Sequence, residues 1–289
     1  EALGFVPPTE NPYLAGTRIH LLDAATGSET VIENRDHPDA LFSGPQWTSD
    51  GSLLLVVVGK PAVLDDRPYP TYAYPVDLAV KEFDPGGAFV RDWDAPEFTL
   101  GSSAEVLGGT RVMVMTPSNT SRHVYVVDAA APQAPAVPVF TGSGALYGWD
   151  LAADLFVYVR GDVTVPGELY VGEAANVAGT SEALTSVNAG LASLSHIAYQ
   201  TIRYRTSSGY DVEGVYVYPA DWPFPPPEPK PVVVWQAGGP GGQMVNSWGT
   251  SVESPYSMLP NFGIPVFMVN GAGRLSNGPQ FYADMAEGR

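Results

Sequence analysis

The chain has 289 residues, of which 45% are hydrophobic, so it is long and apolar enough to bury a sizeable core in one large domain or two smaller ones. Its 31 acidic and 14 basic residues give a net charge of −17. This excess argues against nucleic-acid and anionic-membrane partners, which bind basic patches. The absence of cysteine excludes disulfides, zinc thiolates and a cysteine nucleophile.

Short runs rich in Val, Leu and aromatic residues recur through the first 205 residues, and turn sequences such as AATG, TSDG and DPGG separate them. The runs predict strands at 19–22, 53–58, 112–115, 124–127, 155–159 and 202–204. No helical periodicity persists there, and no apolar run reaches the roughly 18 residues of a membrane-spanning helix. The start, EALGFVPPTE, lacks the regions of a signal peptide, which leaves either a cytoplasmic location or export after loss of a leader.

Four strand-turn units in this region are similar to one another. They begin at Ile19, Leu78, Val124 and Leu169, so that successive starts are 59, 46 and 45 residues apart. A period in the mid-forties built from four short strands is typical of a β-propeller blade. The fold class we expect is therefore mostly β, with about four blades of a larger propeller; an irregular β-sandwich is the alternative.

The pattern changes between residues 197 and 204, where we place a domain boundary. Residues 1–200 are assigned to the blades and residues 201–289 to a second, incomplete domain. The second part opens with a predicted hairpin, TSSGYDVEGVYVYP (206–219), and a proline-rich surface connection follows it. The run VVVWQ (232–236) is apolar on both faces, which predicts a central parallel strand.

That strand runs directly into a glycine-rich turn, Gly238 to Gly242, and a second apolar run, IPVFMVN from Ile264, ends in GAGRLSNG. Between them lies a segment with helical potential that Gly263 would cap. Open sheets with parallel strands place ligands at the carboxyl ends of those strands. Backbone N–H groups of the glycine-rich turn are suited to stabilising an oxyanion there.

This order of blades, hairpin, proline-rich connection, strand, GGPG and a strand ending in Asn-Gly resembles the prolyl oligopeptidase family of serine peptidases, in the branch of the acylaminoacyl and dipeptidyl peptidases. The layout resembles the family over the whole chain, and the specific motifs lie in 206–273. The resemblance implies a propeller that shields an α/β-hydrolase domain, with the first part of that domain in residues 201–289. Short peptides would reach a Ser-Asp-His triad between the two domains.

The resemblance also implies roles for individual residues. The family's His-Gly-Gly-Pro motif matches Ala237 to Pro240, so the backbone N–H of Gly239 would contribute to the oxyanion hole, with Gly238 shaping the turn. Ala237 stands where the family has His or Tyr, which excludes a side-chain donor at that position. Asn270 and Arg274 match the two ends of the family's Asn-Tyr-Arg-Gly-Ser segment and are expected to bind substrate.

Arg274 would offer a cation to a substrate carboxylate or carbonyl, although a plain surface charge is the alternative. The Tyr and Arg of the family segment are missing. Family propellers also supply acidic groups that bind a peptide N-terminus, and the candidates for that role are Glu168, Glu173, Asp65 and Asp66.

The chain contains no G-x-S-x-G sequence, the nucleophile motif of α/β hydrolases, whose triad follows the order Ser, Asp, His. All triad members are therefore expected beyond Arg289, in a C-terminal remainder present as a separate polypeptide after cleavage in an exposed loop. The four histidines precede the glycine-rich turn and are expected to be structural: His20, His37, His123 and His196. No cofactor or metal is expected.

The function we expect is part of a serine peptidase that cleaves short peptides through an acyl-enzyme. One alternative is a non-catalytic propeller that binds or scaffolds partners beside a degenerate hydrolase domain. The other is an esterase of the same fold, since the same acyl chemistry cleaves esters. The expected partners are a short peptide and the C-terminal remainder, and a homo-oligomer is left open.

Overall fold

The structure is a computed structural model, and it describes residues 18–33, 41–48, 51, 54–61, 75–93, 104–108, 110–128, 131, 134–152, 154–194, 196–236, 242–271, 274–277 and 281. Two compact units divide the chain. Unit 1 is Glu1–Thr116, Tyr125–Val137 and Gly278–Arg289, and unit 2 is Pro117–Val124 and Pro138–Asn277. Residues 117–124 thus belong to unit 2, although the residues before and after them belong to unit 1. The domain boundary at residue 200 stays a prediction.

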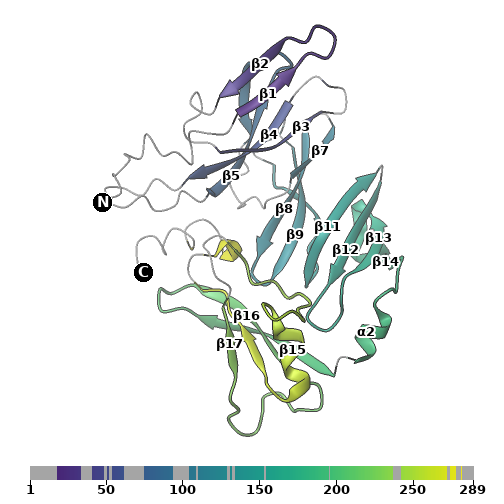
Figure 1. The fold of residues 1–289 in the computed structure, drawn as a ribbon, viewed down its shortest axis with the longest axis vertical. Coiled ribbons are helices and arrows are strands. Elements are labelled where there is room, and N and C mark those ends of the chain that lie inside the picture. Colours follow the sequence, from purple (N-terminus) through teal and green to yellow (C-terminus); the bar gives the residue numbers. More distant parts are fainter. Residues whose placement is uncertain are drawn as a thin grey trace. The chain divides into compact units, whose positions relative to one another are not determined.

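Three four-stranded sheets follow one another along the chain, and in each of them strands adjacent in sequence are paired (Figure 1). The first sheet contains β3 (Leu41–Trp47), β4 (Leu54–Pro61), β5 (Pro75–Phe83) and β6 (Phe89–Trp93). The second contains β7 (Ala104–Gly108), β8 (Arg111–Ser118), β9 (Ser121–Asp128) and β10 (Val137–Phe140). The third contains β11 (Ala145–Ala152), β12 (Leu155–Gly161), β13 (Glu168–Glu173) and β14 (Glu182–Ala183).

The predicted repeat corresponds to these sheets. The units that begin at Leu78, Val124 and Leu169 start within β5, β9 and β13, which are the third strands of the three sheets. The unit at Ile19 falls in β1 (Arg18–Leu22), which forms a separate antiparallel pair with β2 (Glu29–Glu33). One period of the sequence therefore builds one four-stranded sheet, and the described part of the chain contains three such sheets and one strand pair.

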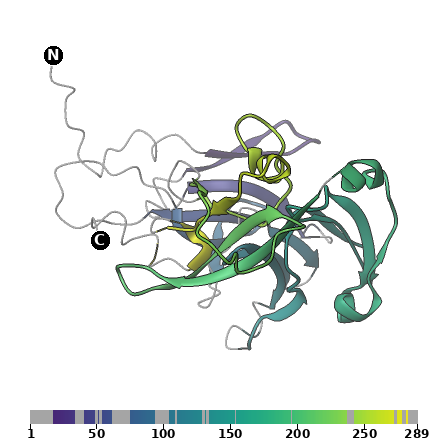
Figure 2. The ribbon, with the colours of Figure 1, turned by 90° about the horizontal axis from the view of Figure 1, so that it is seen from below.

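A fourth sheet differs from these three because it mixes strand directions and its order is not sequential. Its strands are β15 (Ile197–Arg205), β16 (Asp211–Pro219), β17 (Val233–Trp235) and β18 (Val266–Met268), in the order β15-β16-β18-β17. β15 and β16 pair antiparallel over nine residues each and are longer than β17 and β18 (Figure 2). The hairpin predicted within residues 206–219 is wrong in its bounds, because this segment contains only the turn and the second strand, β16, and the first strand, β15, precedes it. β17 runs parallel to β18.

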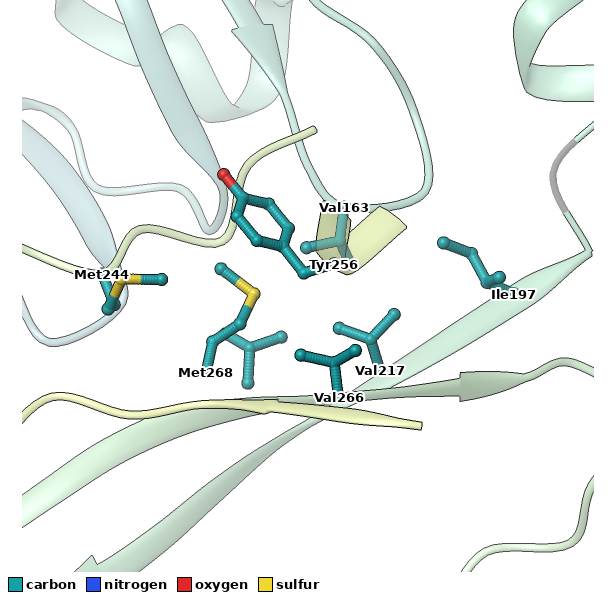
Figure 3. Packing of buried hydrophobic residues seen from close by; sticks show 8 residues of the cluster. Val163, Ile197, Val217, Met244, Tyr256, Val266 and Met268 are labelled. Atoms are coloured by element: carbon teal, nitrogen blue, oxygen red, sulfur yellow. The ribbon is translucent and has the colours of Figure 1, made fainter. Parts of the chain in front are cut away.

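The core of this region lies on one face of the mixed sheet. Val215 and Val217 of β16 alternate with tyrosines that point to the other face, and Val266 and Met268 of β18 join them on the core side. Tyr256 packs over these strands (Figure 3). The members of the buried cluster are Val163, Ile197, Val215, Val217, Met244, Tyr256, Val266 and Met268.

The segment between β17 and β18 is helical and is capped by Gly263, as predicted, but it forms two short 3₁₀ helices: η4 (Pro255–Ser257) and η5 (Leu259–Phe262). Pro260 separates the two, because a proline inside a continuous helix has no N–H to donate and clashes with the carbonyl four residues before it, whereas Pro255 and Pro260 are each tolerated in the first turn of their own helix. Gly263 adopts φ 78°, and its N–H donates to the carbonyls of Leu259 and Pro260.

The strand predicted to be central, β17, is the last strand of its sheet among the described residues. Val233 and Trp235 pack against the core, whereas the intervening Val234 is 59% exposed.

The α-helices of the described ranges, α1 (Val177–Thr180) and α2 (Ala189–Leu194), have four and six residues. No helix in these ranges is long and apolar enough to span a membrane.

Candidate functional site

The carboxyl ends of β17 and β18 lie side by side at the same end of the mixed sheet, because the two strands are parallel. Gly239, the predicted oxyanion donor, and Gly238, predicted to shape the turn, follow β17 in sequence but lie outside the described residues. Asn270 follows β18 and is described. The geometry described below is therefore that of two segments: residues 242–249, which follow the turn in sequence, and residues 269–271 and 274–277, which follow β18.

Asn270 is fully buried, and its side-chain amide bonds to three separate segments. Its Oδ1 accepts from the N–H of Met244 at 2.8 Å. Its Nδ2 lies 3.0 Å from the carbonyl of Met244, 3.2 Å from that of Asn119 and 3.3 Å from that of Glu213. The backbone carbonyl of Asn270 accepts from the hydroxyl of Tyr204 at 2.9 Å. The amide thus has its acceptor and both its donor hydrogens engaged with the backbone.

Residues 243–249, which we call the strap, have no regular secondary structure and lie directly after Gly242. Gln243 donates through Nε2 to the carbonyls of Asn119 at 2.8 Å and Ser121 at 2.6 Å. The N–H of Asn246 donates to the carbonyl of Thr120 at 2.8 Å. The strap is therefore tied to the β8–β9 turn, residues 119–121, by side-chain and backbone hydrogen bonds.

The strap also bonds to segments around β11 and β12. The N–H of Val163 donates to Oδ1 of Asn246 at 3.1 Å, and the N–H of Trp248 donates to the hydroxyl of Tyr147 at 3.2 Å. Asn246 is 2% exposed, so its side chain replaces solvent as the partner of a buried backbone group. This irregular segment can be buried because side chains and distant backbone groups provide hydrogen-bond partners for its polar groups.

Arg274 is 4% exposed, and burial lowers the pKa of its guanidinium from the ordinary value. It packs against the glycine-rich turn's last residue: a Cβ on Gly242 would lie 2.7 Å from Nη1 of Arg274. Glycine at 242 therefore permits this close approach, and a side chain there would displace the end of the Arg274 side chain. In the neighbouring segment, the carbonyl of Ser276 accepts from the N–H of Asn119 at 3.0 Å.

The acidic residues considered for binding a peptide N-terminus are in different environments. Glu168 is 7% exposed, and its carboxylate accepts from the hydroxyl of Thr185 at 2.5 Å and from the N–H groups of Asn188 at 2.6 Å and Val187 at 3.1 Å. These bonds, the one from Thr185 first, lower the pKa of Glu168. Glu173 is exposed, and Asp65 and Asp66 lie outside the described residues.

The described histidines are dispersed. Nδ1 of His20 lies 2.6 Å from a carboxylate oxygen of Glu29 on the exposed β1–β2 pair. Burial lowers the pKa of His123, while the charge of Glu213 acts in the opposite direction. The backbone N–H of His196 donates to Asn261 at 2.9 Å. Among the described residues, no three His, Asp or Glu form a group that could hold a metal ion.

Two cavities formed by described residues lie away from Asn270 and Arg274. One of about 440 Å³ is lined by Phe140, Tyr158, Arg160 and, among others, Val177 and Ala178 at the start of α1. The other, of about 640 Å³, lies between His196, Trp222 and Asn261. Neither cavity contains a residue predicted to belong to the site.

Sequence reasoning missed the residues that tie this region together. Gln243 and Asn246 are polar residues with no motif of their own, and Asn119 begins an Asn-Thr-Ser sequence that says nothing about these contacts. In the structure, Asn119 stands out because its φ is 50°, the one non-glycine value in the left-handed region among the described residues. A backbone angle of this kind cannot be read from the sequence.

Neither a protein-family model nor a curated protein sequence matches the chain. Solved structures do match. They include acylaminoacyl peptidase from Pyrococcus horikoshii (TM-score 0.65, 19% identity, 93% of this chain and 38% of that one). Oligopeptidase B from Leishmania major also matches (TM-score 0.61, 12% identity, 93% and 37%), as does dipeptidyl peptidase 4 from Porphyromonas gingivalis (TM-score 0.55, 15% identity, 91% and 42%).

These three proteins belong to the prolyl oligopeptidase family, and the chain spans less than half the length of each one. The chain therefore has the fold of a part of prolyl oligopeptidase-family proteins, with a mostly β structure made of several small sheets.

Proposed function

We propose that the chain is part of a serine peptidase of the prolyl oligopeptidase type, which cleaves short peptides through an acyl-enzyme. In this proposal the three four-stranded sheets and the β1–β2 pair belong to a propeller, and the mixed sheet is the first part of an α/β-hydrolase domain. The observation that carries it is the order β15-β16-β18-β17, with a parallel β17–β18 pair whose carboxyl ends lead into Gly238–Gly242 and Asn270.

The proposed catalytic contribution of this chain is electrostatic. The N–H of Gly239, in a turn shaped by Gly238, would donate to the oxyanion of the tetrahedral intermediate, and loss of one such donor costs about 100-fold or more in kcat. Asn270 and Arg274 were predicted to bind substrate, and that stays a prediction. Because both side chains are buried, the role we propose for them is to support the segment that follows the turn, where Asn270 bonds to Met244 and Arg274 approaches Gly242.

The edge of the mixed sheet favours a partner that supplies further strands. The N–H of Val233 donates to Pro265 and the carbonyl of Trp235 accepts from Val269, so these residues face β18. Because backbone groups alternate in direction along a strand, the N–H and C=O of Val234 face the other side, where no strand of the described residues pairs with β17. An open parallel edge with an exposed apolar side chain is prone to pair with another chain.

We propose that the C-terminal remainder of the hydrolase domain, which would carry the Ser-Asp-His triad, covers this edge. Its first strand would run parallel to β17 and accept and donate through the backbone of Val234. The open edge and the absence of a nucleophile motif in this sequence support the same arrangement.

The proposal is tested by kinetics of the native preparation. We expect hydrolysis of an N-acetylated short peptide anilide, with a burst of product when the acyl-enzyme accumulates from the matching nitrophenyl ester. Hydrolysis of the ester alone would instead support the esterase, which uses the same acyl chemistry. Hydrolysis of neither substrate would contradict the proposal and favour the non-catalytic binding or scaffold protein.

A further inference from the structure

We infer that Asn270 is a positioning residue that holds the start of the strap against the β8–β9 turn and against β16. The inference rests on the proposed function for its catalytic consequence, but its structural part stands on the contacts alone. Both backbone polar groups of Met244 bond to Asn270: Oδ1 of Asn270 accepts from the N–H of Met244, and Nδ2 donates to its carbonyl.

The same amide reaches the two elements against which Met244 is held. Nδ2 of Asn270 bonds to the carbonyl of Asn119 in the β8–β9 turn and to that of Glu213 in β16. Asn270 itself is fixed at its backbone by the hydroxyl of Tyr204 in β15. One buried side chain therefore joins the turn, the sheet and the strap, and water does not replace its bonds because the amide is 0% exposed.

Gln243 strengthens the same connection. Its Nε2 donates to Asn119, whose carbonyl also accepts from Asn270, so the two side chains share one acceptor. A carbonyl oxygen has two lone pairs and accommodates both donors. The turn is thus bound by both residues, and loss of either donor is expected to loosen the contact that the other one makes.

The chemical consequence follows from connectivity. Gly239, the proposed oxyanion donor, precedes Met244 by five positions in the sequence. Because so few residues separate them, a shift in the position of Met244 would also displace the N–H of Gly239. A displacement of about 1 Å at a reacting group costs about 100-fold in rate. Asn270 would act on catalysis only through this placement, because its side chain has no polar group left for a substrate.

The test compares Asn270→Ala with Asn261→Ala in the native preparation. Asn261 serves as the control because its amide also bridges backbone groups of unit 2, donating to the carbonyl of Ser257 and accepting from the N–H of His196. Its link to the strap is indirect and at the far end from Met244, since Ser257 bonds to Gly249. For Asn270→Ala we expect kcat for the peptide anilide to fall roughly 10- to 100-fold while KM changes less than about threefold. For Asn261→Ala we expect kcat within about twofold of the unsubstituted protein.

Hydrogen exchange gives a readout that does not depend on activity. The amides of Met244 and Asn246 should exchange about tenfold faster or more in Asn270→Ala than in Asn261→Ala. Unchanged exchange at these amides would overturn the inference. If the unsubstituted protein hydrolyses no substrate, the proposed function fails, whereas the exchange measurement still decides whether Asn270 holds the strap.

A second variant guards against loss of folding in Asn270→Ala. Gln243→Ala removes only the two donor contacts to Asn119 and Ser121, and we expect a smaller fall in kcat in the same direction. Because Gln243 and Asn270 share an acceptor, their effects should be non-additive in the double variant. Simple additivity, or a kcat in Gln243→Ala equal to that of Asn261→Ala, would overturn the inference.

Discussion

The side-chain amide of Asn270 donates to the backbone carbonyl of Asn119 at 3.2 Å, joining residues that lie 151 positions apart. The same carbonyl accepts from Gln243 at 2.8 Å. The β8–β9 turn of a repeated sheet is therefore bonded to the segment that follows the glycine-rich turn. In the proposed enzyme, these bonds join a propeller hairpin to the strap, residues 243–249, which follows the proposed oxyanion donor Gly239 in sequence.

The backbone of Asn119 gives the first prediction. Its φ of 50° lies in the left-handed region, which costs a residue with a Cβ roughly 1–2 kcal/mol and asparagine or glycine less. We expect Asn119→Ala to lower the free energy of unfolding by about 1 kcal/mol. Asn119→Gly serves as the control and should cost less than the alanine variant in denaturant titrations. Equal losses in both variants would show that backbone strain is not the cause.

The open edge of β17 gives the second prediction. Proline at position 234 removes an N–H that faces away from β18, so it spares the β17–β18 pairing but blocks the pairing that we propose with the remainder of the hydrolase domain. Val234→Pro should therefore abolish co-purification of that polypeptide, whereas Val234→Thr should preserve it. Retention of the second polypeptide by Val234→Pro would place its contact elsewhere.

His123 gives a prediction for pH. Burial lowers its pKa below the ordinary value of 6.5, so between the two pKa values the unfolded state binds more protons than the folded state. The free energy of unfolding should therefore fall as the pH drops below about 6.5. His123→Gln should flatten this part of the profile when unfolding is measured from pH 7.5 to pH 5. A variant with the unchanged slope would assign the dependence to another group.

Glu168 gives a prediction that separates structure from substrate binding. Its carboxylate is engaged with Thr185, Val187 and Asn188, and these bonds lower its pKa. The stabilisation is present above the unfolded pKa and is lost as the pH falls through the lowered folded pKa. Glu168→Gln should lower the melting temperature at neutral pH while leaving KM for a peptide with a free N-terminus unchanged. A large rise in KM would instead support the role in binding a peptide N-terminus.

Much of the strand content could be predicted from local patterns. The six predicted strands coincide with parts of β1, β4, β8, β9, β12 and β15, because each has apolar or alternating residues bounded by turn chemistry. The short strands β6 and β14 were not predicted, because Phe89 and Val90 of β6 and both residues of β14 are exposed and their pairing depends on the neighbouring strand. The repeat was visible because the third strand of each sheet has a similar sequence.

The support of the candidate site could be predicted only in part. Asn270 was identified through a resemblance, but its bonds to Met244 and Asn119 depend on chain segments 26 and 151 residues away. VVVWQ was expected to be central because it is apolar on both faces, and the described sheet places it last. The side chain of Val234 points to the face of the sheet opposite the core, so its apolar character calls for an element that covers that face, in addition to a strand at the edge.

The central claim is that this chain works with a nucleophile supplied from beyond Arg289. The most direct test is to label the native preparation with a fluorophosphonate probe, separate the polypeptides under denaturing conditions and determine the mass of each band. The account predicts label on a co-purifying polypeptide and none on this 30.7 kDa chain. Label on no band, or an intact mass showing only this chain as a folded monomer, would contradict it.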